Sequence, residues 1–140
     1  MDSQQKNGDL MPAKWTILDG IIYTELSGEV NYDMIMKYID FISSLKGKIV
    51  NRYELHDHTN TTNINLSADD IRNIAEYSMK NNDIFDQFFL AIYAPNDLTF
   101  GMARMFESFY EIKNRKINSQ IFRDKEDAIQ FLKNKMSEYG

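Results

Sequence analysis

Residues 88–94 read FFLAIYA, seven consecutive apolar residues that end at Pro95. A strand with one face in water alternates apolar and polar side chains, whereas this run is apolar on both faces. Strands of that kind lie inside parallel sheets whose two faces are both covered, usually by helices. The run therefore predicts an α/β protein with this segment as a central strand.

Four other segments have strand character. Residues 15–18 and 21–26 are rich in β-formers and are joined by Asp19-Gly20, a pair that suits the left-handed dihedrals of a type I′ hairpin turn. Residues 49–57 predict a third strand and residues 118–122 a last one. The polar residues between 58 and 66 predict a loop.

Helix patterns lie between these strands. Apolar residues recur at three- and four-residue steps after Asn31, a good N-cap, and again after Ser67, which forms a capping-box pattern with Asp70. A third helix is expected after Asn96 or Asp97, with Leu98, Met102, Met105, Phe106, Phe109 and Ile112 as its buried face. Acidic residues from position 124 onward predict the start of a final helix.

The predicted order is β-β-α-β-α-β-α-β-α. Strands that alternate with helices imply a mostly parallel mixed sheet with right-handed crossovers, and the hairpin adds one antiparallel N-terminal strand. Helices are expected to cover the sheet. Residues 1–13 are polar and predict a flexible tail, so residues 14–140 are interpreted as a single domain.

Composition excludes several classes of protein. The chain has no cysteine, which removes disulfide frameworks and thiolate chemistry. Its formal charge of −5 disfavours non-specific nucleic-acid binding, which depends on lysine and arginine. No apolar run approaches the length of a membrane span, and the N-terminal residues lack a signal-peptide pattern. We therefore expect a cytoplasmic protein without integral membrane association.

Short motifs in the second half of the chain add a family resemblance. Residues 100–106 read FGMARMF, residues 121–124 read IFRD, and residues 126–132 read EDAIQFL. Together with LSGEV at 26–30, these segments resemble the SpoIIAA-like (STAS-related) domains, in which a Gly-x-x-Arg-aromatic helix precedes a similar strand and helix. The resemblance spans roughly residues 14–132 and implies a small sheet covered by helices.

The same resemblance implies a role in regulation or ligand binding. Anti-sigma-factor antagonists of this type carry a phosphorylatable serine in an Asp-Ser-Ser-Gly-type motif after the third strand. Residues 55–70 contain no such motif, and Ser67 is the serine near the start of the following helix. Ser67 is therefore the candidate phosphorylation site. Related domains have also been compared with Sec14-type lipid carriers, so an apolar ligand is the alternative.

His56, Asp57 and His58 form the most suggestive polar cluster. The imidazoles suit metal ligation, or one could act as a general base oriented by Asp57. Strand alternation would place both histidines on one side and Asp57 on the other, and no third ligand has helpful spacing. Surface or loop-capping roles are the competing interpretation, and we predict no metal site, no catalytic residue and no cofactor.

Two further segments could bind an anion. Thr59 and its polar neighbours, with Ser67, place hydroxyl groups beside a helix N-terminus, where N–H groups favour negative charge, although capping and loop hydrogen bonds are the favoured explanation for them. Arg104 could hold a carboxylate or phosphate, with Phe100 and Gly101 beside it. Alternatively, Gly101 allows tight helix packing and Arg104 pairs with Glu107 or Glu111 on the surface.

These features together predict a non-catalytic regulatory or ligand-binding module. It would bind a partner protein or a small anion through the loop 56–67 and the start of the third helix. A Sec14-like carrier of a lipid or other apolar molecule is the alternative, an enzyme using His56 and Asp57 is a third hypothesis, and exposed Tyr110 or Phe131 could form a homodimer patch. The predicted binding residues are Asp57, His58, Thr59, Ser67, Phe100, Gly101 and Arg104.

Overall fold

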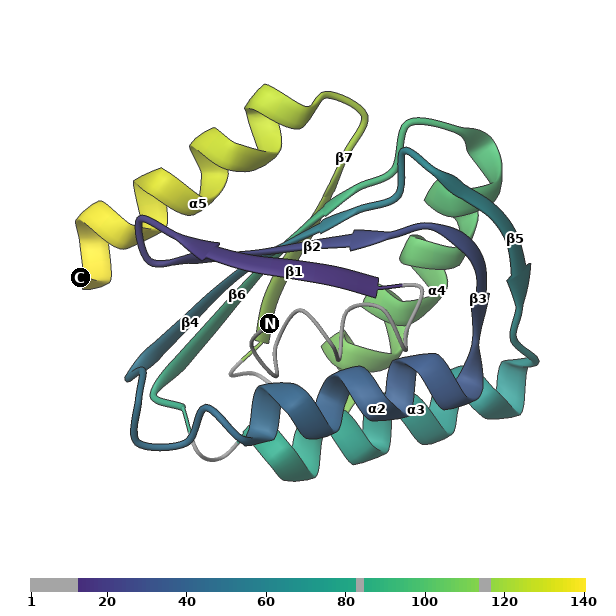
Figure 1. Ribbon diagram of the computed structural model, residues 1–140, viewed down its shortest axis with the longest axis horizontal. Coiled ribbons are helices and arrows are strands. Elements are labelled where there is room, and N and C mark those ends of the chain that lie inside the picture. Colours follow the sequence, from purple (N-terminus) through teal and green to yellow (C-terminus); the bar gives the residue numbers. More distant parts are fainter. Residues whose placement is uncertain (1–12, 83–84, 114–116) are drawn as a thin grey trace, which may run out of the picture.

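A computed structural model describes residues 13–82, 85–113 and 117–140 as a layered α/β domain (Figure 1). Its main sheet has five strands in the order β1-β2-β4-β6-β7. The bounds of these strands are Ala13–Leu18 for β1, Ile21–Leu26 for β2, Asn51–Asp57 for β4, Gln87–Tyr93 for β6 and Ile117–Phe122 for β7. Ala13 thus begins β1, and the remainder of the predicted tail lies outside the described residues.

The strand directions confirm the predicted mixed sheet. β1 and β2 are antiparallel, and their turn places Asp19 at φ 53° and Gly20 at φ 81°, the left-handed values that a type I′ turn requires. β2, β4, β6 and β7 are all parallel. The run at 88–94 therefore lies inside the sheet, between β4 and β7, as we predicted from its apolar side chains on both faces.

A second, two-stranded sheet corrects the loop that we predicted for residues 58–66. β3 (Gly28–Asn31) pairs in parallel with β5 (Thr61–Asn65). β5 contains three β-branched residues, and its backbone groups pair with β3, although most of its side chains are exposed. Its polarity reflects an exposed edge strand, so only residues 58–60 connect β4 to β5.

Four helices cover the two faces of the main sheet. α2 (Tyr32–Ser43), α3 (Ala68–Asn82) and α4 (Asp97–Lys113) lie on one face, and α5 (Lys125–Tyr139) lies alone on the other (Figure 1). The predicted N-caps are confirmed: the Asn31 side chain accepts from the backbone N–H of Met34, and Asp124 accepts from Glu126 and Asp127. None of these helices, within the part of the chain that is described, combines the length and hydropathy of a membrane span.

The buried stripe of α4 differs from the predicted one. Leu98 and Met105 are 54% and 43% exposed, whereas Thr99 and Ala103 are fully buried. The helix is therefore rotated relative to the apolar pattern, because small residues allow it to approach the sheet closely. The side chains of Phe109, Tyr110 and Ile112 lie outside the described residues.

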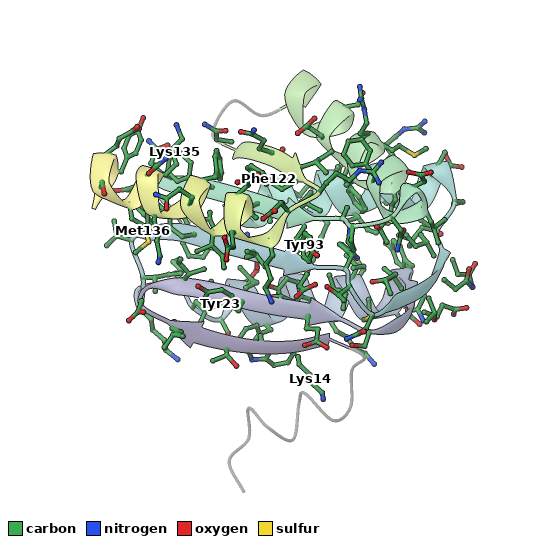
Figure 2. All side chains as sticks on the ribbon, turned by 90° about the horizontal axis from the view of Figure 1, so that it is seen from above. Lys14, Tyr23, Tyr93, Phe122, Lys135 and Met136 are labelled. Atoms are coloured by element: carbon green, nitrogen blue, oxygen red, sulfur yellow. The ribbon has the colours of Figure 1, made fainter. Side chains whose placement is uncertain are left out.

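α5 packs on a buried apolar layer of the sheet, and Figure 2 shows the molecule from the side of this helix. Tyr53 and Leu55 of β4 meet Phe89 and Ala91 of β6 beneath Leu132 of α5, and all five are nearly inaccessible to solvent. Partly buried side chains complete the cluster, among them Tyr23, Tyr93, Phe122 and Met136, labelled in Figure 2. We call this the α5 face of the sheet.

Candidate functional site

The opposite face of the sheet encloses a cavity beneath α2, α3 and α4. Its volume is about 60 Å³. Most of its lining is apolar and comes from both the strands and the helices: Leu26, Val30, Ile35, Ile39, Ile74, Phe88, Leu90, Ile92, Met102, Ala103 and Phe106. We call this the cavity face of the sheet.

Alternate residues of β4 place a row of charged and polar groups in the cavity wall. Arg52, Glu54 and His56 all line the cavity. Nη2 of Arg52 lies 2.7 Å from Oε1 of Glu54, and Nε2 of His56 lies 3.1 Å from the same oxygen. The His56 contact has ion-pair distance without hydrogen-bond alignment, so Arg52 is the stronger partner of Glu54.

Tyr38 of α2 completes this polar cluster from the helical side. Its hydroxyl donates to Oε2 of Glu54, and the Thr24 hydroxyl lies 2.5 Å from the Tyr38 oxygen. Because the single Tyr38 proton goes to the carboxylate, Thr24 is the donor in the second bond. Tyr38, Thr24 and Glu54 are all buried, so the cluster is held from β2, β4 and α2.

The charge of Glu54 is stabilised inside the protein. Burial by itself would raise its pKa, but the charges of Arg52 and His56 and the hydrogen bond from Tyr38 outweigh burial and lower the pKa of Glu54 to about 2. The pKa of Tyr38 is raised well above its usual value, first by burial and then by the charge of Glu54. Glu54 is thus a carboxylate and Tyr38 a neutral phenol at physiological pH.

His58 lies at the end of the cavity where the loop after β4 begins. It lines the cavity and is only 3% exposed. Its Nδ1 lies 2.9 Å from the hydroxyl of Thr61, which in turn donates to the carbonyl of Leu26 at 2.6 Å. Burial, together with the charge of His56, lowers the pKa of His58 to about 3, so the ring is neutral near pH 7.

Asp57 lies on the α5 face, away from both histidines. Its Oδ1 accepts from the backbone N–H and the hydroxyl of Thr59, and its Oδ2 lies 3.0 Å from Nζ of Lys125. The predicted alternation is therefore confirmed, and the hypothesis that Asp57 orients His56 is wrong. Glu54 occupies that position instead. Within the described ranges, no group of three His, Cys, Asp or Glu side chains is placed to hold a metal ion.

The other predicted site residues lie on the surface around α3 and α4. Ser67 and Asp70 form the reciprocal capping box, with both bonds at 3.0 Å. Gly101 is exposed, and a methyl group added there would meet nothing within 4 Å, so no helix packs against it. Arg104 is exposed as well. Phe100 is half-buried, and the guanidinium of Arg123 lies 4.2 Å from its ring centre.

Of the predicted binding residues, His58 lines the cavity, and so does His56, the residue of the enzyme hypothesis. The polar cluster of Arg52, Glu54 and Tyr38 was not predicted, although the sequence contained an indication of it. Positions 52, 54 and 56 carry a basic, an acidic and an imidazole side chain on one face of a strand that adjoins the apolar run. Charges at such positions must be buried and paired, which marks them as a candidate site.

The same fold occurs in solved structures. An uncharacterized protein of the DUF3478 family from Shewanella loihica PV-4, described as having a SpoIIAA-like fold, superposes with a TM-score of 0.56 at 18% identity, covering 86% of this chain and 91% of that chain. The anti-sigma factor antagonist SpoIIAA in its unphosphorylated form superposes with a TM-score of 0.50 at 9% identity, covering 87% and 96%. No protein-family model and no curated protein matches the sequence. The chain therefore has a SpoIIAA-like fold, which confirms the fold that the resemblance in its sequence implied.

Proposed function

We propose that this chain is a non-catalytic binding module that holds a small, largely apolar molecule in the cavity between the sheet and α2, α3 and α4. The observation that carries the proposal is the cavity itself, an apolar space of about 60 Å³ with a few polar groups in its wall. Small-molecule sites have this composition, in which apolar side chains supply affinity and a few polar groups fix orientation. The ligand-carrier alternative from the sequence is thereby preferred to a surface anion site.

The polar groups of the cavity favour binding over catalysis. A general base works best when its pKa lies near the working pH. Glu54, with a pKa of about 2, and His58, with a pKa of about 3, are both weak bases. Glu54 is also occupied by Arg52 and Tyr38, so it is not available to a substrate.

Filling the cavity tests this proposal. Ala103 lines the cavity and is fully buried, so Ala103→Leu would fill part of it from α4. We expect this variant to lose binding of butan-1-ol, a probe of suitable size, in ligand-observed NMR. Gly101→Ala is the matched control on the same helix, because its methyl group meets open space. Equal binding by wild type and Ala103→Leu would refute the cavity as the site.

A native ligand can be sought directly. Native mass spectrometry of protein purified gently from its own cytosol should show a small added mass that organic extraction removes. Trp15, the single tryptophan, has its ring centre 6.3 Å from that of Tyr38 in the cavity wall. Its fluorescence should therefore change when the extracted ligand is restored.

Partner-protein binding is the second candidate, favoured by an exposed stripe on α4. Leu98 and Met105 are exposed seven residues apart, with exposed Gly101 between them and Arg104 alongside. Residues at this spacing share one helix face, and an apolar stripe beside an arginine suits a partner with apolar and acidic groups. The fold shared with an anti-sigma factor antagonist supports the same role.

The partner hypothesis has its own test. Leu98→Ser combined with Arg104→Ala should abolish co-purification of a specific cytoplasmic partner, whereas Gln130→Ala on the exposed side of α5 should not.

Ser67 is exposed at the start of α3, where a kinase could reach it. Because Asp70 accepts a hydrogen bond from the Ser67 backbone, phosphorylation there would place charge beside a carboxylate and disturb the cap. Ser67→Glu therefore serves as the charge variant in the same assay.

A further inference from the structure

The contacts of His58 determine which of its ring nitrogens carries the proton. The Thr61 hydroxyl has one proton, and it donates that proton to the carbonyl oxygen of Leu26, which can only accept. The Thr61 oxygen must therefore accept from His58, whose Nδ1 lies 2.9 Å away. His58 is thus a neutral imidazole protonated at Nδ1, and its Nε2 presents a lone pair.

That lone pair belongs to a ring that is part of the cavity wall. His58 lines the cavity and is 3% exposed, and Nδ1 is already used by Thr61. The backbone around it is fixed as well, since the His58 N–H donates to the carbonyl of Tyr93 and its carbonyl accepts from the Thr61 N–H. The ring is therefore a positioned acceptor, with Nε2 as its remaining polar atom.

The charged groups in the rest of the cavity wall already face one another. The fully buried carboxylate of Glu54 lies 2.7 Å from Arg52 and 3.1 Å from Nε2 of His56, which also lines the cavity. An anionic ligand would have to compete with that carboxylate for Arg52, and a cationic one would approach Arg52 itself. Transferring a charged ligand into this largely apolar space would carry a desolvation cost without a free counter-charge.

We propose that the cavity selects an uncharged ligand that carries one hydrogen-bond donor, such as an alcohol, and that this donor binds Nε2 of His58 while the apolar part contacts the remaining wall. This inference rests on the proposed function, because it names the ligand class for the same cavity. The two hydrogen bonds that join His58, Thr61 and the carbonyl of Leu26 determine this selectivity, because they keep the proton of His58 on Nδ1 and leave Nε2 without one. A ligand without a donor would leave that nitrogen buried and unpaired.

Two isomeric probes separate the effect of the hydrogen-bond donor on affinity from the effects of ligand size and polarity. Butan-1-ol and methyl propyl ether have the same formula, but only the alcohol can donate. We expect the alcohol to bind at least about fivefold more tightly in ligand-observed NMR titrations, the ratio that one ordinary hydrogen bond supplies. Butanoate, the charged analogue, should bind more weakly than the alcohol. Equal affinities for alcohol and ether, or tighter binding of butanoate, would overturn the inference.

Two variants of one residue test the chain of hydrogen bonds. Thr61→Ser keeps the hydroxyl and should keep the preference for the alcohol. Thr61→Val is nearly isosteric but removes the hydroxyl that fixes the His58 tautomer. The affinities for the alcohol and the ether should therefore become nearly equal. His58→Leu should abolish the preference entirely. A preference that persists unchanged in His58→Leu would show that another group recognises the donor.

The tautomer can be measured without any ligand. The chain has two histidines, so ¹⁵N spectra of the imidazoles contain two ring patterns, and His58→Leu assigns them. We expect His58 to show a proton on Nδ1 and none on Nε2. A proton on Nε2 would refute the inference even if the cavity binds ligands. If the tautomer is as stated but no probe binds, the proposed function fails, and the inference about its ligand fails with it.

Discussion

Alternate residues of β4 enter two environments that differ in polarity and in packing. On the α5 face, Tyr53 and Leu55 lie in a filled apolar layer beneath Leu132. On the cavity face, Arg52 and Glu54 lie in the wall of an open space beneath three helices. The same seven-residue strand therefore supports a dense core on one side and a polar-lined cavity on the other.

The difference indicates that the cavity face is not arranged for stability alone. Burying apolar side chains stabilises a fold in proportion to the area removed from water. A buried ion pair gives little net stability, because the loss of hydration offsets the attraction between the charges. A cavity likewise forgoes the contacts that its walls would otherwise make. Both faces bury apolar clusters that stabilise the fold, but on the cavity face a binding role would also explain the buried charges and the cavity.

The largest expected effect comes from removing one half of the buried ion pair. Arg52→Met leaves the Glu54 carboxylate without its closest charged partner, and the loss in the free energy of unfolding should be about 3–5 kcal/mol in urea denaturation. The double variant Arg52→Met/Glu54→Leu should recover most of that loss. A double variant as unstable as the single one would show that the cluster itself, rather than charge balance, holds this face together.

Acid should destabilise the cavity face before it affects the α5 face. His58 has a pKa of about 3 in the folded protein against 6.5 in the unfolded chain, so its contribution is complete above pH 6.5 and is lost as the pH falls toward 3. Between pH 6.5 and 4.5 this amounts to about 2–3 kcal/mol. Glu54 adds a second loss between pH 4.5 and about 2.

Urea unfolding at several pH values measures this dependence. His58→Leu should flatten the curve between pH 6.5 and 4.5. Asp57→Asn is the matched control, because hydrogen bonds from Thr59 and contact with Lys125 outweigh burial and lower the pKa of Asp57 below 3.8, outside this range. A wild-type stability that stays constant from pH 6.5 to 4.5 would contradict the burial of a neutral His58.

Two buried alanines provide a direct comparison of packing. Ala128 on the α5 face and Ala103 on the cavity face are both fully buried. Ala128 lies in the buried apolar cluster of the α5 face, so Ala128→Leu should overpack it and lower stability by about 1–3 kcal/mol. Ala103→Leu extends into the cavity and should change stability by less than about 1 kcal/mol. Thermal unfolding of both variants tests this difference. Equal losses would mean that the cavity face is as tightly packed as the α5 face.

The fold could be predicted from the sequence because its determinants are local. Each local pattern specifies one element without reference to the others. These patterns are the run at 88–94, which is apolar on both faces, the Asp19-Gly20 turn, and the caps at Asn31 and Asp124. β5 was missed because its polar side chains resemble a loop, and only pairing with β3 reveals it. Pairing between distant segments is not visible in a local pattern.

The candidate site could be predicted only in part, for the same physical reason. His58 was identified because histidine is rare in this chain and chemically distinctive. Glu54 and Tyr38 were not, because their contact joins a strand to a helix 16 residues away in the sequence. The exposure of Leu98 could not be predicted either, since the rotation of α4 depends on how closely Ala103 approaches the sheet.

The smallest predicted effect distinguishes ligand binding in the cavity from binding at the start of α3, where the sequence predicted Ser67 as a binding residue. Ser67 caps α3 on the cavity side of the sheet, and Asp124 caps α5 on the other side. Replacing either residue with alanine removes one capping bond and should cost about 1 kcal/mol in thermal unfolding. Because neither side chain lines the cavity, both variants should bind butan-1-ol as the wild type does. If Ser67→Ala weakens the binding of that probe while Asp124→Ala does not, the site includes Ser67, and the ligand must extend from the cavity to the start of α3.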